Sequence, residues 1–239
     1  MTRKLLIILF ACVATICSNG QKVAFCDCDS LYSKMAEPRL TGDLFVDKIK
    51  SPVSPYFIDD WLDGTILLSN SVTVKSKNLR YNGYIDRLIW LTKDFKQVKL
   101  DKEMVDGFSL QDTKTSETYH FRKIKIMEQF ALDSAIVYAQ VLYENHMSLF
   151  AYRKMALNNH GVTQSTQNIF DVFEKEPAYY FKFHDDKLAE VRHIKKRNIT
   201  KLFPGKEEQV KNLLSAAKQH RVKTEEDLIK ITKLLDGMK

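Results

Sequence analysis

Short runs of β-branched and aromatic residues, separated by turn-forming residues, fill most of the chain between Tyr56 and Ile194. Runs of this length and composition predict β-strands. Partial alternation of apolar and polar side chains along Thr118–Ile126 predicts an antiparallel sheet with one solvent-facing side. The expected strands are Thr65–Leu68, Val72–Lys75, Leu79–Leu91, Gln97–Leu100, Gly107–Leu110, Thr118–Ile126, Ala135–Tyr143, Met147–Met155, Ala178–His184 and Leu188–Ile194.

Beyond Ile194 the hydrophobic period becomes helical. The apolar residues of Glu207–His220 follow the i, i+3, i+4, i+7 spacing of one helix face, and Lys195–Phe203 carries a shorter stripe. Thr224, followed by three acidic residues, predicts the start of a third helix. Strands first and helices last predict an α+β protein, with a mainly antiparallel β body followed by a short helical C-terminal tail.

Helices this short are marginal in water on their own, so the tail needs a partner surface. We expect the β body to supply that surface, with the basic residues of the tail facing solvent. The expected contact residues are Leu202, Phe203, Leu213, Leu214, Leu228, Ile231 and Leu235.

Composition divides the chain into four parts. These are a signal peptide (1–20), an irregular lead-in (21–55), an antiparallel β domain (56–194) and a basic helical tail packed on that domain (195–239). Within the lead-in, only Leu40–Val46 is a candidate for a short strand. The polar segment Asn158–Asn168 predicts a long loop.

The first residues have the order of a secretory signal. Arg3 and Lys4 precede an apolar run, and the small residues Ser18 and Gly20 occupy the −3 and −1 positions of a cut before Gln21. The alternative is a lipoprotein anchored at Cys12. Either way we expect an exported protein, periplasmic or associated with the outer membrane. No later apolar run reaches about 18 residues, so we expect no membrane span after signal removal.

Charge is concentrated in the tail. Thirteen Lys/Arg and six Asp/Glu fall between residues 192 and 239, a net charge of +7, whereas residues 21–191 sum to −2. A basic tail can meet anionic partners, but export and the lack of interleaved aromatic residues beyond Phe203 argue against nucleic acid. Cys26 and Cys28 remain after signal removal; the pair is a weak metal candidate, because no nearby ligands complete a four-ligand site.

The densest pattern in the chain lies between Ser54 and Leu91. Its Ser54-Pro55-Tyr56 segment, its Trp61–Gly64 segment and its Leu79-Arg80-Tyr81-Asn82-Gly83-Tyr84-Ile85-Asp86 strand resemble a group of secreted or periplasmic Bacteroidetes proteins. That group has an "LRYN-x-Y-x-D" strand and a Lys-rich helical C-terminal tail. The resemblance implies an architecture and a location but supplies no activity.

Gly83 departs from this resemblance, because the group usually has an apolar residue there. Asn82-Gly83 is a strong signal for a two-residue hairpin turn, whereas the pattern of the group favours a strand that runs straight through. Both readings stay open at the level of sequence.

The same stretch supplies weak candidates for a binding site. They are Trp61, Arg80, Tyr81, Tyr84, Asp86 and Arg87. These side chains form either a buried hydrogen-bonded network or an exposed recognition face. Aromatic residues on strands are usually core, so we expect Trp61, Tyr81 and Trp90 to lie in the β core.

Catalytic chemistry is sparse. The chain has no G-x-S-x-G, H-E-x-x-H or Walker-type motif, and no cofactor is expected. Asp59, Asp60 and Asp63 surround Trp61, and paired carboxylates near an aromatic ring can serve glycoside hydrolysis. His184, Asp185 and Asp186 together are the nearest approach to a metal-binding cluster, but a hairpin turn explains them better, because Asp favours turns.

The sequence therefore favours an exported, non-catalytic envelope protein with a binding or scaffolding role, whose partner is an envelope protein or a glycan. One alternative is an envelope hydrolase acting on glycan or peptide. Another is an accessory or sensor subunit that docks through its helical tail.

Overall fold

The structure is a computed structural model that describes residues 22–25, 40–127, 134–160, 170–216 and 222–237. Its strands are β1 Lys22–Phe25, β2 Leu40–Leu44, β3 Leu62–Leu68, β4 Thr73–Asn82, β5 Arg87–Leu91, β6 Gln97–Leu100, β7 Val105–Asp112, β8 Glu117–Met127, β9 Ser134–Glu144, β10 Ser148–Tyr152, β11 Met155–His160, β12 Phe170–Lys175, β13 Ala178–Lys182 and β14 Leu188–Glu190. Its helices are α1 Lys196–Thr200, α2 Glu207–Ala216 and α3 Glu225–Asp236.

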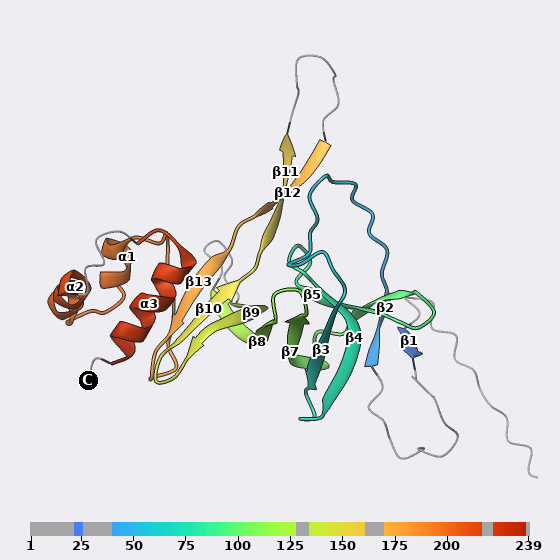
Figure 1. The fold of residues 1–239 in the computed structure, drawn as a ribbon, viewed down its shortest axis with the longest axis horizontal. Helices are drawn as coiled ribbons and strands as arrows, with labels where there is room; N and C mark the ends of the chain where they lie inside the picture. The colour runs from blue at the N-terminus through green and yellow to red at the C-terminus, as the bar shows by residue number, and fades with distance from the viewer. Residues whose placement is uncertain (1–21, 26–39, 128–133, 161–169, 217–221, 238–239) are drawn as a thin grey trace, which may run out of the picture.

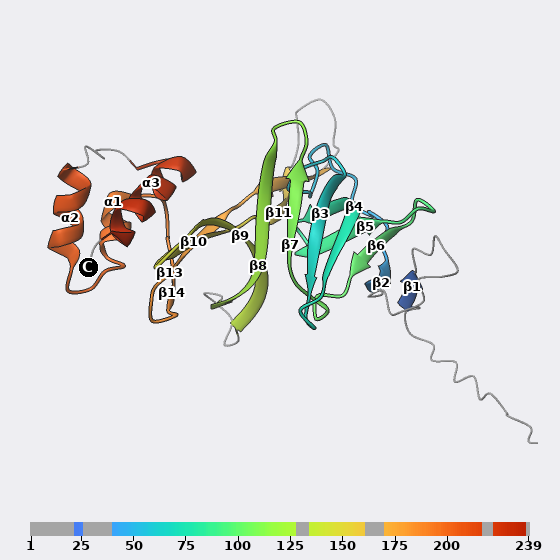
Figure 2. The ribbon, with the colours of Figure 1, turned by 60° about the horizontal axis from the view of Figure 1, so that its bottom comes forward.

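Among the described residues, twelve strands form one antiparallel sheet in the order β1-β2-β6-β5-β4-β3-β7-β8-β9-β10-β13-β14. The remaining two, β11 and β12, pair with each other as a hairpin that projects from the sheet (Figure 1). The helices lie together at the β13–β14 end of the elongated molecule, away from β3, β4 and β5 (Figure 2). The prediction of an α+β protein with an antiparallel β body is confirmed at this level.

The main core lies on one face of the β2-to-β9 part of the sheet. Its centre is aromatic: the rings of Phe108 and Phe121 stack with centroids 4.7 Å apart, and Tyr81 and Tyr138 lie against them. Phe57, from the segment before β3, packs edge-on against Phe121. Burial on one face explains the partial alternation along strands such as β3 and β6, where buried side chains alternate with half-buried or exposed ones. β5 is buried on both faces, with Leu88, Ile89 and Trp90 all buried.

The lead-in is less irregular than predicted. β1 and β2 pair with each other, and β2 pairs with β6 through Gly42 and Leu100, so both strands belong to the main sheet. Leu40 is buried in the core. The sheet therefore begins well before residue 56, the boundary that composition suggested. The short apolar run around Leu40 was the only signal for it.

β4 combines two runs that were predicted as separate strands, Val72–Lys75 and the first residues of Leu79–Leu91. A residue with left-handed backbone, Asn78 at φ 62°, lies inside β4, and the β3–β4 register shifts beside it, between Leu62 and Gly64. This irregularity has the features of a β-bulge, which changes the face on which following side chains lie. Lys75 and Lys77 are consequently exposed, whereas Leu79 is fully buried.

Neither reading of Asn82-Gly83 is correct. β4 ends at Asn82 and β5 begins at Arg87, so a four-residue turn joins them. The Asn82 side-chain oxygen accepts hydrogen bonds from the backbone N–H groups of Tyr84 (3.0 Å) and Ile85 (3.2 Å). Asn82 therefore fixes the turn through its side chain, a common role of Asn in turns.

Glycine is required at position 83 because neighbouring backbone lies too close for a side chain, and not because the backbone is left-handed there. Its N–H donates to the carbonyl of Pro55, and its own carbonyl accepts from Met155 N–H at 3.2 Å. A Cβ on residue 83 would lie 2.2 Å from the carbonyl oxygen of Arg153. The turn thus touches the segment before β3 and the start of β11 so closely that only glycine fits.

Several other boundaries differ from those predicted. Asn158 lies on β11 rather than in a loop, and β14 ends at Glu190, four residues earlier than expected. The turn at Asp185 and Asp186 is present, with Asp186 at φ 61°.

The helices surround a second apolar cluster. Leu149 of β10 and Phe181 of β13 supply the sheet side of it, and Leu214, Leu228 and Ile231 supply the helix side. All five side chains are fully buried. Of the other expected contact residues, Leu235 is buried, while Leu202, Phe203 and Leu213 are partly buried against the same cluster. α1 is shorter than predicted. α2 covers Glu207–Ala216 of the expected second helix, and residues 217–220 of that helix lie outside the described residues.

Carboxylates hold both ends of α3 on the sheet. At its start, Glu225 accepts two hydrogen bonds from the Arg153 guanidinium (2.6 and 2.8 Å) and one from the Tyr179 hydroxyl (3.0 Å). At its end, Asp236 accepts from the Tyr143 hydroxyl (2.9 Å), the Asn145 amide (2.7 Å) and the Met147 backbone N–H. Thr224 caps the helix in a capping box with Asp227, as the hydroxyl before the acidic run predicted.

The close approach at Gly83 predicts a large loss of stability in Gly83→Ala. The added methyl group must displace the backbone around Arg153, which we expect to cost about 1–3 kcal/mol of unfolding free energy. Gly237→Ala is the matched control, since its Cβ would meet nothing closer than 3.6 Å and its φ is −79°. Urea denaturation measures both; equal stability of the two variants would contradict the close contact.

The contacts of Asp236 predict a pH-dependent anchor. Partial burial opposes ionisation, but the hydrogen bonds from Met147, Tyr143 and Asn145 outweigh it and lower the pKa of Asp236. A lowered folded-state pKa contributes stability that is present above the unfolded value of about 3.9 and is lost as pH falls. Asp236→Asn should therefore reduce the unfolding free energy by about 1 kcal/mol at pH 7 and by less near pH 3. Exposed Glu103→Gln is the control, and a pH-independent difference for Asp236→Asn would refute the anchor.

Candidate binding groove

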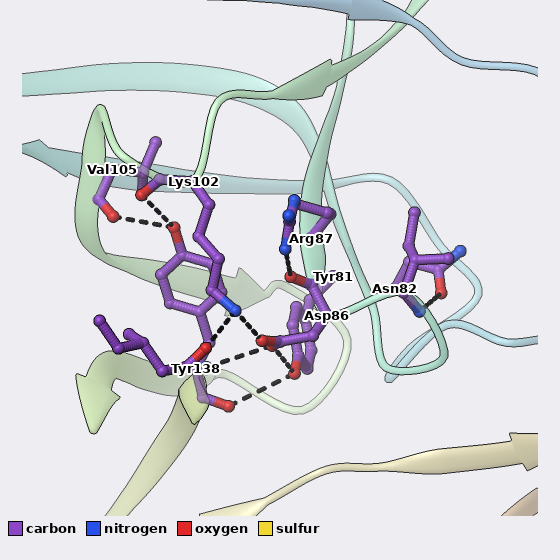
Figure 3. A network of polar contacts seen from close by, with 9 residues as sticks. Tyr81, Asn82, Asp86, Arg87, Lys102, Val105 and Tyr138 are labelled. Atoms are coloured by element: carbon purple, nitrogen blue, oxygen red, sulfur yellow. Dashed lines mark hydrogen bonds and ion pairs between the residues drawn. The ribbon is translucent and has the colours of Figure 1, made fainter. Parts of the chain in front are cut away.

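Two of the candidate residues, Tyr81 of β4 and Asp86 of the β4–β5 turn, belong to a buried network (Figure 3). The Asp86 carboxylate accepts hydrogen bonds from the Tyr81 hydroxyl (2.8 Å) and from the Tyr138 backbone N–H (3.1 Å), and it pairs with the Lys102 ammonium. The Tyr138 hydroxyl donates to the Val105 carbonyl at 2.8 Å. The network therefore joins the turn to β9 and to the segment between β6 and β7.

This network is structural rather than a ligand site. Tyr81 is fully buried, and Asp86 is 6% exposed. Burial, together with the adjacent Asp86 carboxylate, raises the pKa of the Tyr81 hydroxyl well above its ordinary value, so it stays protonated. Arg87 donates to the Asp86 backbone carbonyl at 2.9 Å, while Tyr84 is exposed and its ring lies 5.1 Å from that of Phe173.

Arg80 lies apart from this network. Its guanidinium lies over the Trp61 ring at 4.3 Å and over the Tyr56 ring at 5.0 Å. Trp61 is half-buried and precedes β3, so the prediction that it belongs to the β core is wrong: its ring contacts a cation instead. Tyr81 and Trp90 are core residues, as predicted.

The carboxylates near Trp61 do not gather into a catalytic pair. Asp60 is exposed and pairs with Lys114 at 2.6 Å, and Asp59 is also exposed. Asp63 instead faces a hollow on the sheet. Within the described residues, no three His, Cys, Asp or Glu side chains are placed to hold a metal ion. Gly20, Gln21, Cys26 and Cys28 lie outside the described residues.

The hollow beside Asp63 lies on the face of the sheet opposite the main core. Its volume is about 620 Å³. Cationic side chains of Lys75, Lys77 and Lys93 line it, and polar side chains of Thr65, Asn78, Ser109, Gln111 and Thr118 complete most of the wall. Trp90, whose ring belongs to the core, closes one side.

The fold creates this hollow where β4 separates from β5. The two strands pair only through Leu79–Asn82, so the first part of β4 has β3 as its only described strand partner. Thr65 pairs with Lys75 on one side and with Ser109 on the other, which places all three side chains on one face. Two residues further along these strands, Gln111 of β7 pairs with Asp63 of β3 and with Thr118 of β8. These three side chains therefore lie on the same face as Thr65 and Ser109.

A second hollow of about 420 Å³ continues the first. Both include Thr65 and Ser109, whose hydroxyl oxygens are 2.6 Å apart. The second hollow extends over His120 and Arg122 towards Glu144, and the last two form an ion pair. We call the two hollows together the groove.

The chemistry of the groove suits a polar ligand held by many weak contacts. Hydroxyl and amide side chains both donate and accept hydrogen bonds, which matches the hydroxyl groups of sugars. The groove is open and crosses several strands, so it fits an extended molecule rather than a small enclosed one.

Comparison of the chain with family models, with curated proteins and with solved structures gave no match. Of the helices described, the longest has 12 residues, and none has the length and hydropathy of a transmembrane segment.

Sequence reasoning missed the groove because its residues come from separate strands. The one local signal was Thr73, Lys75 and Lys77, an alternation of polar residues on a strand whose partner residues were unknown. Pairing with Thr65 and Ser109 could not be read from the chain alone.

The Asp86 network predicts a structural phenotype. Asp86→Ala removes the acceptor of the Tyr138 N–H and leaves the Tyr81 hydroxyl and the Lys102 ammonium with backbone carbonyls as acceptors. The largely buried ammonium then lacks its counter-charge, so we expect a loss of about 3–5 kcal/mol of unfolding free energy. Asp86→Asn keeps an oxygen acceptor and should lose less. Asp60→Asn, which breaks an exposed ion pair, should cost under about 1 kcal/mol. Thermal and urea unfolding measure all three; a normally stable Asp86→Ala would show that the network is dispensable for folding.

Proposed function

We propose that the protein is an exported, non-catalytic cell-envelope protein that binds a carbohydrate ligand in the groove on its sheet. The observation that carries this proposal is the 620 Å³ hollow, which is lined by hydroxyl, amide and ammonium groups from β3, β4, β7, β8 and the segment after β5. Ligand sites combine a concave shape with a few convergent polar groups.

Export is supported by the order of basic, apolar and small residues before Gln21. The resemblance of the Leu79–Asp86 strand to secreted Bacteroidetes proteins supports the same location. A glycan of the envelope is the ligand class that such a location offers.

A binding role fits the site better than hydrolysis. Glycoside hydrolases need two carboxylates within about 5–10 Å on opposite sides of the scissile bond. Among the described residues, Asp63 is the one carboxylate that lines the first hollow. Asp60 is paired with Lys114 at the surface, and Glu144 in the second hollow is paired with Arg122. The polar groups of the first hollow suit recognition and leave the second catalytic position without a candidate.

The helical tail is proposed to be a structural part of this binding protein rather than a free docking arm. Its support is the pair of carboxylate anchors, Glu225 and Asp236, and the apolar cluster that α3 shares with β10 and β13. These contacts occupy the apolar side chains that a partner would otherwise need.

The test is binding of envelope polysaccharide fragments by isothermal titration calorimetry. Gln111→Ala with Thr118→Ala removes two exposed polar side chains of the groove, and we expect affinity to fall about tenfold, equivalent to about 1.4 kcal/mol. The matched control is Gln209→Ala with Asn212→Ala, two exposed polar residues of α2, which should leave affinity unchanged.

Two results would contradict the proposal. One is equal loss of affinity in the groove variant and in the α2 control, which would place the ligand elsewhere. The other is release of reducing ends from the bound glycan by purified protein, which would establish an enzyme.

A further inference from the structure

The cationic side chains of the groove are concentrated at one end. Lys75 and Lys77 are exposed, share one face of β4 and form no ion pair among the residues that the structure describes. Lys93, beyond β5, lies on the same hollow, and Asp63 is the one acidic side chain that lines it in the part of the chain that the structure describes. This end is therefore positive, although residues 21–191 as a whole carry a net charge of −2.

The other end of the groove is electrically balanced. Arg122 is held by Glu144 in a two-bond ion pair, whose second hydrogen bond is 2.8 Å. A cation neutralised in this way attracts an anion weakly. His120 and the hydroxyls of Thr65 and Ser109 offer hydrogen bonds there instead.

The length of the groove sets the size of the ligand. It runs across β5, β4, β3, β7, β8 and β9, which are successive strands of the sheet. Neighbouring strands are about 4.8 Å apart, so five steps span about 24 Å. That is the length of an oligosaccharide, not of a single sugar.

From this charge distribution and length we propose that the ligand is an acidic glycan, lying across the strands with its anionic sugars over Lys75 and Lys77 and its neutral sugars over β7 and β8. This inference rests on the proposed function. It adds the chemical class of the ligand and the direction in which the ligand lies across the strands. Lys75 and Lys77 are two residues apart on one strand, about 6.6–6.8 Å along it. They therefore suit anionic groups on the same or adjacent sugars.

An acidic peptide is the competing anionic polymer, and the groove favours the glycan. The first hollow is lined by Trp90 and Leu91 as its large apolar side chains, and Trp90 is only 7% exposed. Peptides gain affinity from side chains inserted in apolar pockets, whereas hydroxyl and amide walls match sugar hydroxyls.

The experiment compares four probes by calorimetry on the full mature chain. They are an oligogalacturonate, the same oligomer with its carboxylates methyl-esterified, dextran sulfate and poly-glutamate. We expect the oligogalacturonate to bind at least tenfold more tightly than its neutral ester and than poly-glutamate. Dextran sulfate separates carboxylate from sulfate recognition: weaker binding than oligogalacturonate supports a carboxylated glycan, and equal or tighter binding overturns carboxylate preference.

The matched variants carry equal charge changes. Lys75→Gln with Lys77→Gln should weaken oligogalacturonate binding about tenfold and reduce its dependence on salt. Lys201→Gln with Lys206→Gln removes two exposed lysines of the tail and should change affinity less than twofold. Equal losses in both variants would mean non-specific attraction and would overturn the proposal, as would equal binding of poly-glutamate.

The outcomes separate this inference from the proposed function. If neutral glycans bind in the groove as tightly as acidic ones, the binding function stands and the acidic ligand is refuted. If the correctly folded wild-type chain binds none of the glycans, neutral or acidic, the proposed function itself fails.

Discussion

The buried carboxylate of Asp86 is the interaction on which the sheet depends. It gathers a tyrosine hydroxyl from β4, a backbone N–H from β9 and an ammonium group from the segment after β6. These elements are separated by several strands in the sheet, so contact between them requires the sheet to bend around the aromatic core. A charge this deeply buried is tolerated only when it is fully paired, and that requirement fixes how the strands meet.

Bending of the sheet in turn leaves its other face free. The main core takes its apolar side chains from one face, and the helices pack at the β10–β13 end rather than over the middle of the sheet (Figure 2). The polar face of β3, β4 and β7 is therefore uncovered by any described helix. The β-bulge at Asn78 and the early separation of β4 from β5 then hollow this face beside Trp90. The bulge and the separation of the two strands are thus features of the fold that also shape the groove.

Much of the fold could be predicted from the sequence, since periodicity reports local burial directly. The strands around Phe121 and the capped helix that begins after Thr224 are examples. Events that depend on distant partners could not be predicted. Gly83 is required because the Arg153 carbonyl lies against it, 70 residues further along the chain. Trp61 lies outside the main core, and its ring contacts the Arg80 guanidinium instead. The groove escaped detection for the same reason, because strand pairing assembles it.

Arg153 connects two of the apolar clusters of the described structure, the main core and the cluster under the helices. Its guanidinium lies 5.5 Å from the Phe57 ring, which packs on the main core, and also binds Glu225 at the start of α3. Its backbone carbonyl lies against Gly83. Two cores at different ends of an elongated sheet would ordinarily open as separate cooperative units. A residue with contacts to both raises the free-energy cost of opening either one alone, so Arg153 couples the stability of the two ends of the sheet.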